Sequence, residues 1–303
     1  MCQFHGSLVG VLLPMLISPS LLAQQTTTDE HAHHLGALAS TAPATTMWRG
    51  QGNALPAGAS NADARLQSSP RHGEWVTVKT SPTDSVVAWL VYPERRTKAP
   101  VVVVIHEIFG LSNWIRGVAD QLAADGFIAV APDLLTMKRA GNLTSEWQRD
   151  SAVAAIRTLS RDNVLRDLDA VANYATSLPA ATKTYGVVGF CWGGSTSFAY
   201  AVHSPHLGAS VVYYGTSPET TDLPSVKAPV LGLYGGEDAR VNSTIGRADS
   251  ALKSLGRTYQ HYEFAGAGHG FLRQQDGQNG ANLAATREAW PKTVAWFKKY
   301  LAG

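Results

Sequence analysis

The stretch that most restricts the fold is residues 189–194, which read Gly-Phe-Cys-Trp-Gly-Gly. A run rich in β-branched residues, 185–188, precedes it, and a segment rich in Ala, Ser and Phe, 195–203, follows it. This order predicts a strand, a sharp turn and a helix, with Cys191 at the turn. The glycines suit a turn in which strand and helix approach so closely that a Cβ would clash. The thiol would then project at a helix N-terminus, where backbone N–H groups favour a thiolate.

Length and charge limit the domain count and the classes of partner. The chain has 303 residues with a formal net charge of +2, and its only cysteines are Cys2 and Cys191. This length suits a single α/β domain, and the balanced charge gives no reason to expect nucleic acid as a partner. A disulfide between the extreme N-terminus and the turn is not expected, so the chain has no disulfide framework.

The N-terminal segment 1–23 resembles a secretory signal peptide that ends at Ala23. Its apolar stretch is short and interrupted by prolines, so no membrane span is expected to remain after its removal. It departs from the usual pattern in having no Lys or Arg and in placing Leu21 three residues before the cleavage point. We expect an exported protein, periplasmic or secreted, and a cytoplasmic one if this segment is not a signal peptide.

Residues 24–72 contain mostly small and polar side chains. Such a segment buries too little apolar surface to offset its ordering entropy, so we expect a disordered linker. The folded domain is then expected at 73–303.

From residue 74 onward, strand-like runs alternate with helical spacing. Strands are expected at 75–80, 86–92, 101–105, 127–131, 185–188, 209–214, 230–234 and 259–264. Helices are expected at 116–125, 164–177, 195–203, 244–255 and 283–300, and one more after a capping box of Ser145 and Gln148. The first two strands should be antiparallel, and the others should form a mostly parallel sheet with helices on both faces. Ligands bind such sheets at the carboxyl ends of the strands.

Three reactive side chains follow predicted strands in the second half of the chain. They are Cys191, Asp238 and His269, and this order of nucleophile, acid and histidine is that of α/β-hydrolases. His269 would take the proton of the thiol and later activate water, while Asp238 would orient the imidazole and stabilise its charge. Glu237 is the alternative to Asp238.

At these residues the chain resembles the dienelactone hydrolase family of α/β-hydrolases. The resemblance covers about residues 74–300 and rests on five segments: His-Glu-Ile-Phe-Gly at 106–110, Ala-Pro-Asp-Leu at 131–134, the cysteine turn, Gly-Glu-Asp at 236–238, and Gly-His-Gly-Phe at 268–271. It implies the same triad of Cys191, Asp238 and His269. It also implies that Glu107 contacts the resting thiol and helps to form the thiolate.

The resemblance further implies an oxyanion hole and a carboxylate site. The backbone N–H groups of Trp192 and Ile108 would hold the oxyanion, and losing one such donor typically costs about 3 kcal/mol. Arg273, four residues after the histidine, would bind a substrate carboxylate, since guanidinium suits bidentate contacts. A second arginine is expected before the cysteine turn. Arg149 is the first choice, and Arg139 and Arg157 remain alternatives.

The implied reaction is hydrolysis of a small lactone or carboxylic ester through a thioacyl intermediate, without a cofactor and by a monomer. No metal is expected, because the sequence lacks ligand spacing such as H-E-x-x-H. Two other functions remain open: a general thiol esterase or acyltransferase acting on envelope esters, and a binding protein on a hydrolase scaffold without catalysis. A redox sensor is less well supported, because Cys191 has no resolving cysteine. The sequence does not decide whether residues 136–162 form a lid.

Overall fold

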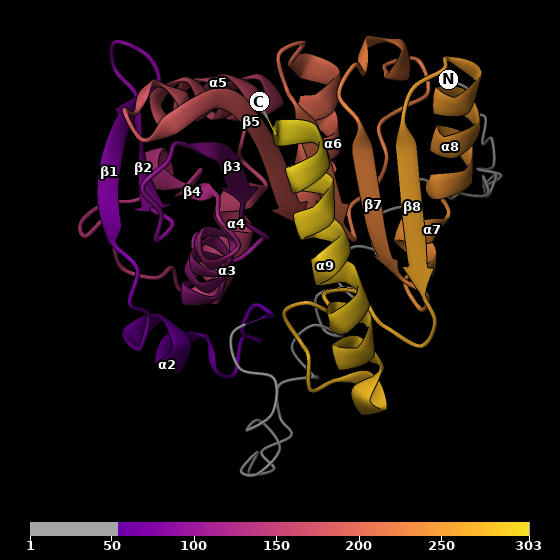
Figure 1. Ribbon diagram of the computed structural model, residues 1–303, viewed down its shortest axis with the longest axis horizontal. Coiled ribbons are helices and arrows are strands. Elements are labelled where there is room, and N and C mark those ends of the chain that lie inside the picture. The colour runs from indigo at the N-terminus through magenta and orange to yellow at the C-terminus, as the bar shows by residue number, and fades with distance from the viewer. Residues whose placement is uncertain (1–53, 303) are drawn as a thin grey trace, which may run out of the picture. The chain divides into compact units, whose positions relative to one another are not determined.

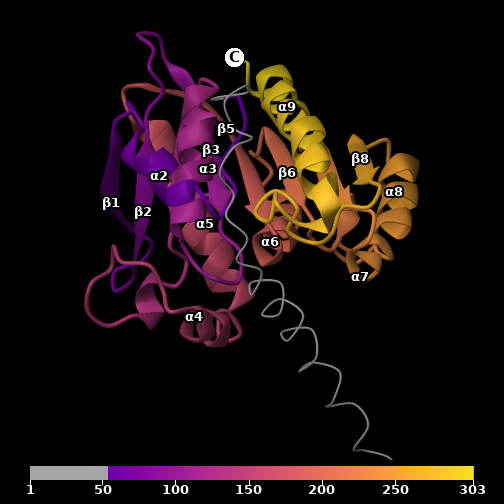
Figure 2. The same cartoon turned by 90° about the horizontal axis from the view of Figure 1, so that it is seen from below.

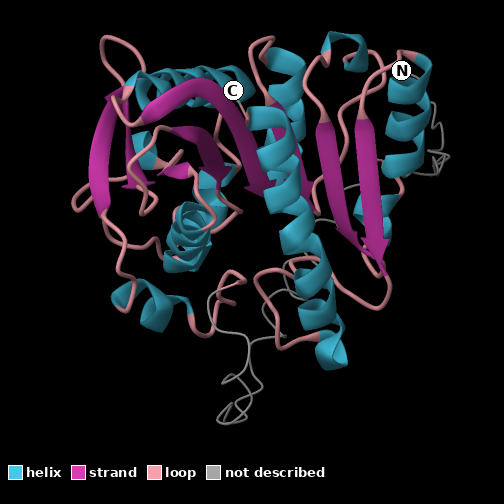
Figure 3. Cartoon of the chain, in the orientation of Figure 1, coloured by secondary structure: helices cyan, strands magenta, loops and turns pink. Residues whose placement is uncertain are grey.

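A computed structural model describes residues 54–302, and a single eight-stranded sheet forms its centre (Figures 1 and 3). The strands are β1 (Gly73–Lys79), β2 (Ser85–Val91), β3 (Ala99–Ile105), β4 (Ile128–Pro132), β5 (Ala181–Phe190), β6 (Ala209–Tyr213), β7 (Val230–Gly235) and β8 (Tyr259–Phe264). Their order across the sheet is β1-β2-β4-β3-β5-β6-β7-β8. Strand β2 runs antiparallel to both of its neighbours, and all the other pairs are parallel. The predicted α/β fold class is therefore confirmed.

Helices cover both faces of the sheet. They are α2 (Ala62–Gln67), α3 (Asn113–Ala124), α4 (Arg149–Ile156), α5 (Arg161–Ser177), α6 (Trp192–His203), α7 (Ala239–Asn242), α8 (Ile245–Ser254) and α9 (Ala281–Leu301), with short 3₁₀ turns at Thr136–Lys138, Leu223–Ser225 and Gln278–Gly280. Helices α3 and α9 pack into the core on one face, whereas α5, α6 and α8 pack into the core on the other (Figure 2).

The central strands are buried because helices cover both of their faces. Residues 101–105 of β3 have no exposed surface, which explains their continuous β-branched sequence. Strands β3, β5, β6, β7 and β8 are parallel neighbours, so their carboxyl ends lie at one edge of the sheet. This edge carries the loops that contain the predicted site residues.

Helices α3, α5 and α6 each begin three residues before the predicted start. Helix α3 begins at Asn113 because the Ser112 side chain caps it by accepting a hydrogen bond from the Ile115 N–H at 3.4 Å. The predicted capping box is absent from α4, whose N-cap residue Gln148 makes no side-chain cap bond. Ser145 Oγ instead donates to the Asn142 carbonyl at 3.1 Å.

The prediction of a disordered linker was wrong for residues 54–72. Leu55 and Ala62 are buried, and the Trp114 indole N–H donates to the Ala57 carbonyl at 3.0 Å. Although few in number, these apolar side chains are concentrated where the segment crosses α3, and hydrogen bonds add to their effect. The rest of the predicted linker, 24–53, and the predicted signal peptide lie outside the described residues. Within residues 54–302, no helix is long and apolar enough to cross a membrane.

Candidate active site

Cys191 lies between β5 and α6, in the sharp turn that its sequence predicts. Its backbone has φ of 56° and ψ of −115°, values that L-residues rarely adopt. A Cβ on Gly189 would lie 1.8 Å from the Gly193 carbonyl oxygen, and one on Gly193 would lie 2.4 Å from the His106 oxygen. The chain therefore needs glycine at both positions, and this close approach fixes the direction in which the thiol projects.

The loops after β7 and β8 bring an acid and a histidine together. The His269 Nδ1–H donates to Asp238 Oδ2 at 2.5 Å, and both side chains are largely buried. The neighbouring Glu237 is exposed, so the structure places Asp238 and not Glu237 beside the imidazole. On its other side, His269 has the Cys191 thiol within hydrogen-bonding reach. The three predicted triad residues therefore lie together.

The pKa of His269 reflects a competition between burial and charge. Burial alone lowers the pKa. The negative charge of Cys191, the hydrogen bonds with Asp238 and Cys191, and the charge of Asp238 together outweigh burial and raise the pKa to about 10. With this pKa the imidazole is a cation at neutral pH.

Glu107 lies buried in the loop after β3, close to the triad. Burial raises the pKa of its carboxyl, whereas the charges of Arg273, His269 and Arg149 oppose that rise. The Arg273 Nε lies 2.8 Å from Glu107 Oε1, but its N–H is not aligned for a hydrogen bond, so the contact is an ion pair only. Glu107 thus links the triad to the two arginines.

Both arginines that the sequence analysis favoured stack on one ring. The Cζ atoms of Arg149 and Arg273 lie 4.1 and 5.0 Å from the centre of the Phe109 ring. Burial lowers the pKa of Arg149, and the nearby Arg273 lowers it further. Two neighbouring cations with one carboxylate between them leave excess positive charge, which favours an anionic ligand.

The two alternative arginines lie elsewhere. Arg139 stacks over Trp147 at 4.4 Å, and its nearest carboxylate is Asp133 at 3.6 Å. Arg157 is an exposed residue at the end of α4.

The two predicted oxyanion donors come from the loop after β3 and from the start of α6. Trp192 is the first residue of α6, and the N–H groups of a first helical turn have no partner within the helix. Ile108 lies in the turn after Glu107, where the Gly110 N–H donates to the Glu107 carbonyl at 3.2 Å.

Sequence reasoning assigned no role to two buried residues at this site. His106 was quoted only as part of a motif, yet it is fully buried and stacks on the Trp192 ring at 5.6 Å. Tyr214 follows β6, has φ of 40°, and lies with its ring 5.1 Å from that of His269. Its hydroxyl has no hydrogen-bond partner within the described residues. The only available sequence indication for Tyr214 was its position just after a strand that faces this edge.

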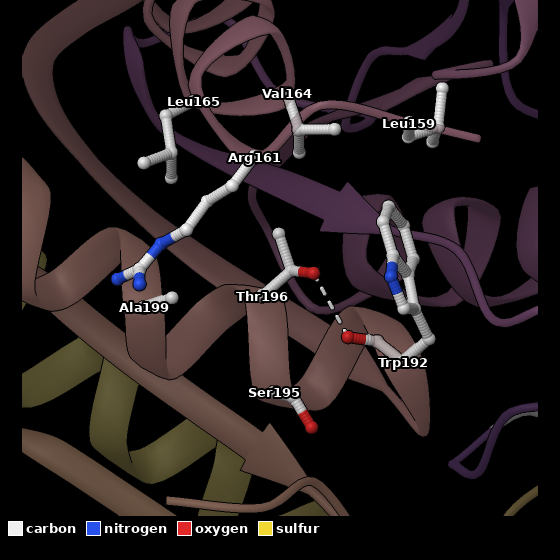
Figure 4. A pocket seen from close by; sticks show the side chains of 8 residues that line it. All are labelled: Leu159, Arg161, Val164, Leu165, Trp192, Ser195, Thr196 and Ala199. Carbon is white, nitrogen blue, oxygen red and sulfur yellow. Dashed lines mark hydrogen bonds between the residues drawn. The ribbon is translucent and has the colours of Figure 1, made fainter. Parts of the chain in front are cut away.

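A cavity of about 300 Å³ lies beside α6, with Trp192 forming one side (Figure 4). The opposite side comes from the start of α5 and from Leu159, two residues before that helix. Most of the lining is apolar: Leu159, Val164, Leu165 and Ala199, with Arg161, Ser195 and Thr196. None of the triad side chains lines it. Among residues 54–302, no cluster of three or more His, Cys, Asp or Glu side chains is suited to hold a metal ion.

Comparison with known proteins agrees with this geometry. The sequence profile of the Dienelactone hydrolase family matches residues 86–301. A protein of Salmonella typhimurium named "Putative carboxymethylenebutenolidase" is 32% identical over 238 residues, which cover 74% of this chain and 87% of that protein. A protein of the same name from Yersinia pestis is 31% identical over 251 residues, which cover 78% of this chain and 92% of that protein. A crystal structure titled as a putative dienelactone hydrolase from Klebsiella pneumoniae superposes with a TM-score of 0.66 at 28% identity, covering 76% of this chain and 99% of that one. The fold, the order of the site residues and these matches agree, and the chain belongs to the dienelactone hydrolase family.

Proposed function

We propose that this hydrolase cleaves a lactone or carboxylic ester through Cys191 and a thioacyl intermediate. The observation that carries the proposal is the Asp238–His269 hydrogen bond of 2.5 Å beside a cysteine with φ of 56° in a strand-to-helix turn. A buried cysteine with only a packing role would need neither the strained backbone nor a charged imidazole next to it.

In the acylation step, the Cys191 thiolate attacks the substrate carbonyl carbon and forms a C–S bond. The N–H groups of Trp192 and Ile108 stabilise the oxyanion of the tetrahedral intermediate. When this intermediate collapses, the C–O bond breaks, and His269 gives its proton to the departing alkoxide. The products are a thioester on Cys191 and a free alcohol, which stays attached to the acyl group if the substrate was a lactone.

In the deacylation step, the neutral His269 takes a proton from water as the water attacks the thioester. The C–S bond breaks, the thiolate of Cys191 reforms, and the carboxylic acid leaves and gives its proton to solvent. Asp238 keeps the Nδ1–H of His269 in place, so that Nε2 faces the departing alkoxide in acylation and the attacking water in deacylation.

The substrate class follows from the charges near Glu107. Arg149 and Arg273 supply two guanidinium groups and Glu107 one carboxylate, so a substrate that carries its own carboxylate would complete the charge balance. A carboxylated lactone such as dienelactone meets this requirement. A neutral ester does not, which makes the general esterase the less favoured function.

The first test is the hydrolysis of dienelactone and of p-nitrophenyl acetate by wild type and by Cys191→Ala. We expect turnover of both substrates by wild type, with the larger kcat/KM for dienelactone, and no turnover by the variant. Circular dichroism should show that the variant keeps the fold. Hydrolysis of the acetate alone would point to the general thiol esterase, and equal rates for variant and wild type would remove Cys191 as the nucleophile. If neither protein had activity, a binding role would be the function to pursue.

We further propose that the enzyme is exported and acts as a monomer. The composition of residues 1–23 supports export. Mass spectrometry of the protein isolated from its native host should find a chain that begins at Gln24. A chain that keeps residues 1–23 would instead indicate a cytoplasmic protein.

A further inference from the structure

His106 is a fully buried, titratable residue for which the proposed mechanism has no use. It is the first residue after β3, and its ring makes two hydrogen bonds. The Leu134 N–H donates to Nε2 at 3.1 Å, and Nδ1 lies 2.8 Å from the Glu107 carbonyl oxygen. These partners fix the tautomer, because Nε2 must accept a proton and Nδ1 must donate one.

The environment keeps this imidazole neutral. Burial lowers the pKa of His106, and the opposing effects of Asp133 and of the Glu107 carbonyl are smaller. A charged ring would also carry a proton on Nε2, which would face the Leu134 N–H. His106 is therefore not a general acid or base, and its chemistry lies in its hydrogen-bond geometry.

The carbonyl that accepts from His106 belongs to the same peptide unit as the Ile108 N–H. A peptide unit is planar and trans, so its C=O and its N–H point in opposite directions. Holding the Glu107 carbonyl therefore fixes the direction of the Ile108 N–H. The Gly110 N–H also binds this carbonyl, at 3.2 Å, but it belongs to the same short turn and cannot anchor the turn to the sheet. His106 does so, because it bridges this peptide to Leu134 on the loop after β4.

His106 also contacts the residue that provides the other oxyanion donor. Its ring stacks on the Trp192 indole with centroids 5.6 Å apart and planes at 22°. Its own carbonyl lies so close to the cysteine turn that Gly193 cannot carry a Cβ. One buried ring thus touches both sides of the proposed oxyanion hole.

We propose that His106 is a positioning residue for the oxyanion hole, holding the 107–108 peptide through Nδ1–H so that the Ile108 N–H points at the substrate oxygen. This role rests on the proposed function. The alternative is a core histidine that only satisfies two backbone groups. In that case loss of either hydrogen bond should have the same effect on the rate of acylation. In the positioning role, only loss of the Nδ1 hydrogen bond should slow acylation.

Two variants test the two hydrogen bonds of His106 separately. In His106→Asn, the side-chain nitrogen can replace Nδ1 and donate to the Glu107 carbonyl, while the acceptor for the Leu134 N–H is lost. In His106→Gln, the longer side chain can replace Nε2 and accept from Leu134, while the donor to Glu107 is lost. Each variant loses one of the two hydrogen bonds, so each is the control for the other.

Two reactions of Cys191 give the readout. Acylation by p-nitrophenyl acetate, followed as the pre-steady-state burst, needs the oxyanion hole, whereas alkylation by iodoacetamide forms no oxyanion. We expect His106→Gln to slow acylation about 10- to 100-fold, because the Ile108 donor would be misplaced and not removed; removal of a donor typically costs more. Alkylation should stay near the wild-type rate, and His106→Asn should acylate nearly as fast as wild type.

Equal acylation rates for the two variants would overturn the proposal, and so would a parallel loss of acylation and alkylation in His106→Gln. Should the variants fail to fold, ¹⁵N NMR of the wild type still tests the tautomer that the proposal requires. We expect a neutral His106 with the proton on Nδ1 at neutral pH, and a neutral ring with its proton on Nε2 would overturn the positioning role. The proposed function fails separately, if the wild-type burst survives in Cys191→Ala.

Discussion

The charge on His269 depends on the state of Cys191. Among the influences that raise the pKa of this imidazole, the negative charge of Cys191 is the largest, and burial acts against it. In the proposed mechanism, acylation removes that charge, so burial then lowers the pKa of His269 and allows it to act as a base. The same residue can therefore be an acid in the resting enzyme and a base in the thioester, without any movement of Asp238.

The variant Cys191→Ala imitates the loss of this charge. We expect the His269 ring to titrate near pH 10 in wild type and at a clearly lower pH in the variant. NMR of the imidazole ¹³C and ¹⁵N nuclei measures both values, and the neutral His106 provides a reference that should not titrate. An unchanged titration in Cys191→Ala would mean that the thiolate does not set the charge of His269.

Arg273 contacts Glu107 and also faces the proposed carboxylate site. We expect Arg273→Ala to raise KM for a carboxylated ester about 10- to 100-fold, the value of a lost charge-assisted contact, and to change KM for its methyl ester much less. Arg149→Ala should behave in the same way, whereas Arg157→Ala, at an exposed position, should change neither. Equal effects of Arg273→Ala on both substrates would make its ion pair with Glu107 its main role.

At the scale of elements, the segment 54–72 acts as a strap on the loop that follows β8. The Ala59 N–H donates to the Arg273 carbonyl at 2.8 Å, and Gln275 Nε2 donates to the Pro56 carbonyl at 3.0 Å. Further along the strap, Arg71 makes a bidentate ion pair with Asp120 of α3, at 2.6 and 3.0 Å. These contacts tie the strap to the histidine-bearing loop and to α3.

Deletion of residues 1–72 should therefore destabilise the folded domain more than deletion of residues 1–53. Loss of the buried apolar side chains and the hydrogen bonds should lower the free energy of unfolding by about 2–4 kcal/mol, which urea denaturation measures. Hydrogen exchange of the 270–277 amides should speed up only in the longer deletion. Identical exchange in both proteins would show that the strap does not restrain this loop.

The sequence predicted the strands better than the strap, for a physical reason. The central strands are buried on both faces, so their β-branched runs are visible without knowledge of their neighbours. The strap has a polar composition, and its order comes from contacts with residues far away in the chain, such as Trp114 and Arg273. Composition alone does not reveal such partners.

The same reasoning applies to the whole site. In a parallel sheet the residues after successive strands meet at one edge, so Cys191, Asp238 and His269 could be brought together from sequence order alone. The roles of His106 and Tyr214 depend on side-chain contacts that no local pattern encodes. The fold class and the chain order of the triad were thus predictable, whereas the hydrogen bonds that orient its peptides were not.

Across the whole molecule, buried tyrosines should make the protein sensitive to alkali. Burial raises the pKa of six phenols above the ordinary value of 10: Tyr92, Tyr200, Tyr213, Tyr214, Tyr234 and Tyr259. Above pH 10 these tyrosines lose their protons in the unfolded chain but keep them in the folded one, so unfolding releases protons and stability falls as pH rises. Below pH 10 the contribution of these tyrosines to the free energy of unfolding is fully present.

Each such tyrosine should lower the free energy of unfolding by about 1.4 kcal/mol per pH unit above pH 10. The pH dependence of urea denaturation between pH 8 and 11.5 measures the combined slope. Tyr213→Phe is the matched variant, because its hydroxyl bonds only Thr293 Oγ1, at 2.7 Å. Its slope should be smaller than that of wild type by one tyrosine's share. A slope unchanged by this variant, or tyrosinate absorbance at 295 nm appearing in the folded protein near pH 10, would show that these phenols ionise before unfolding.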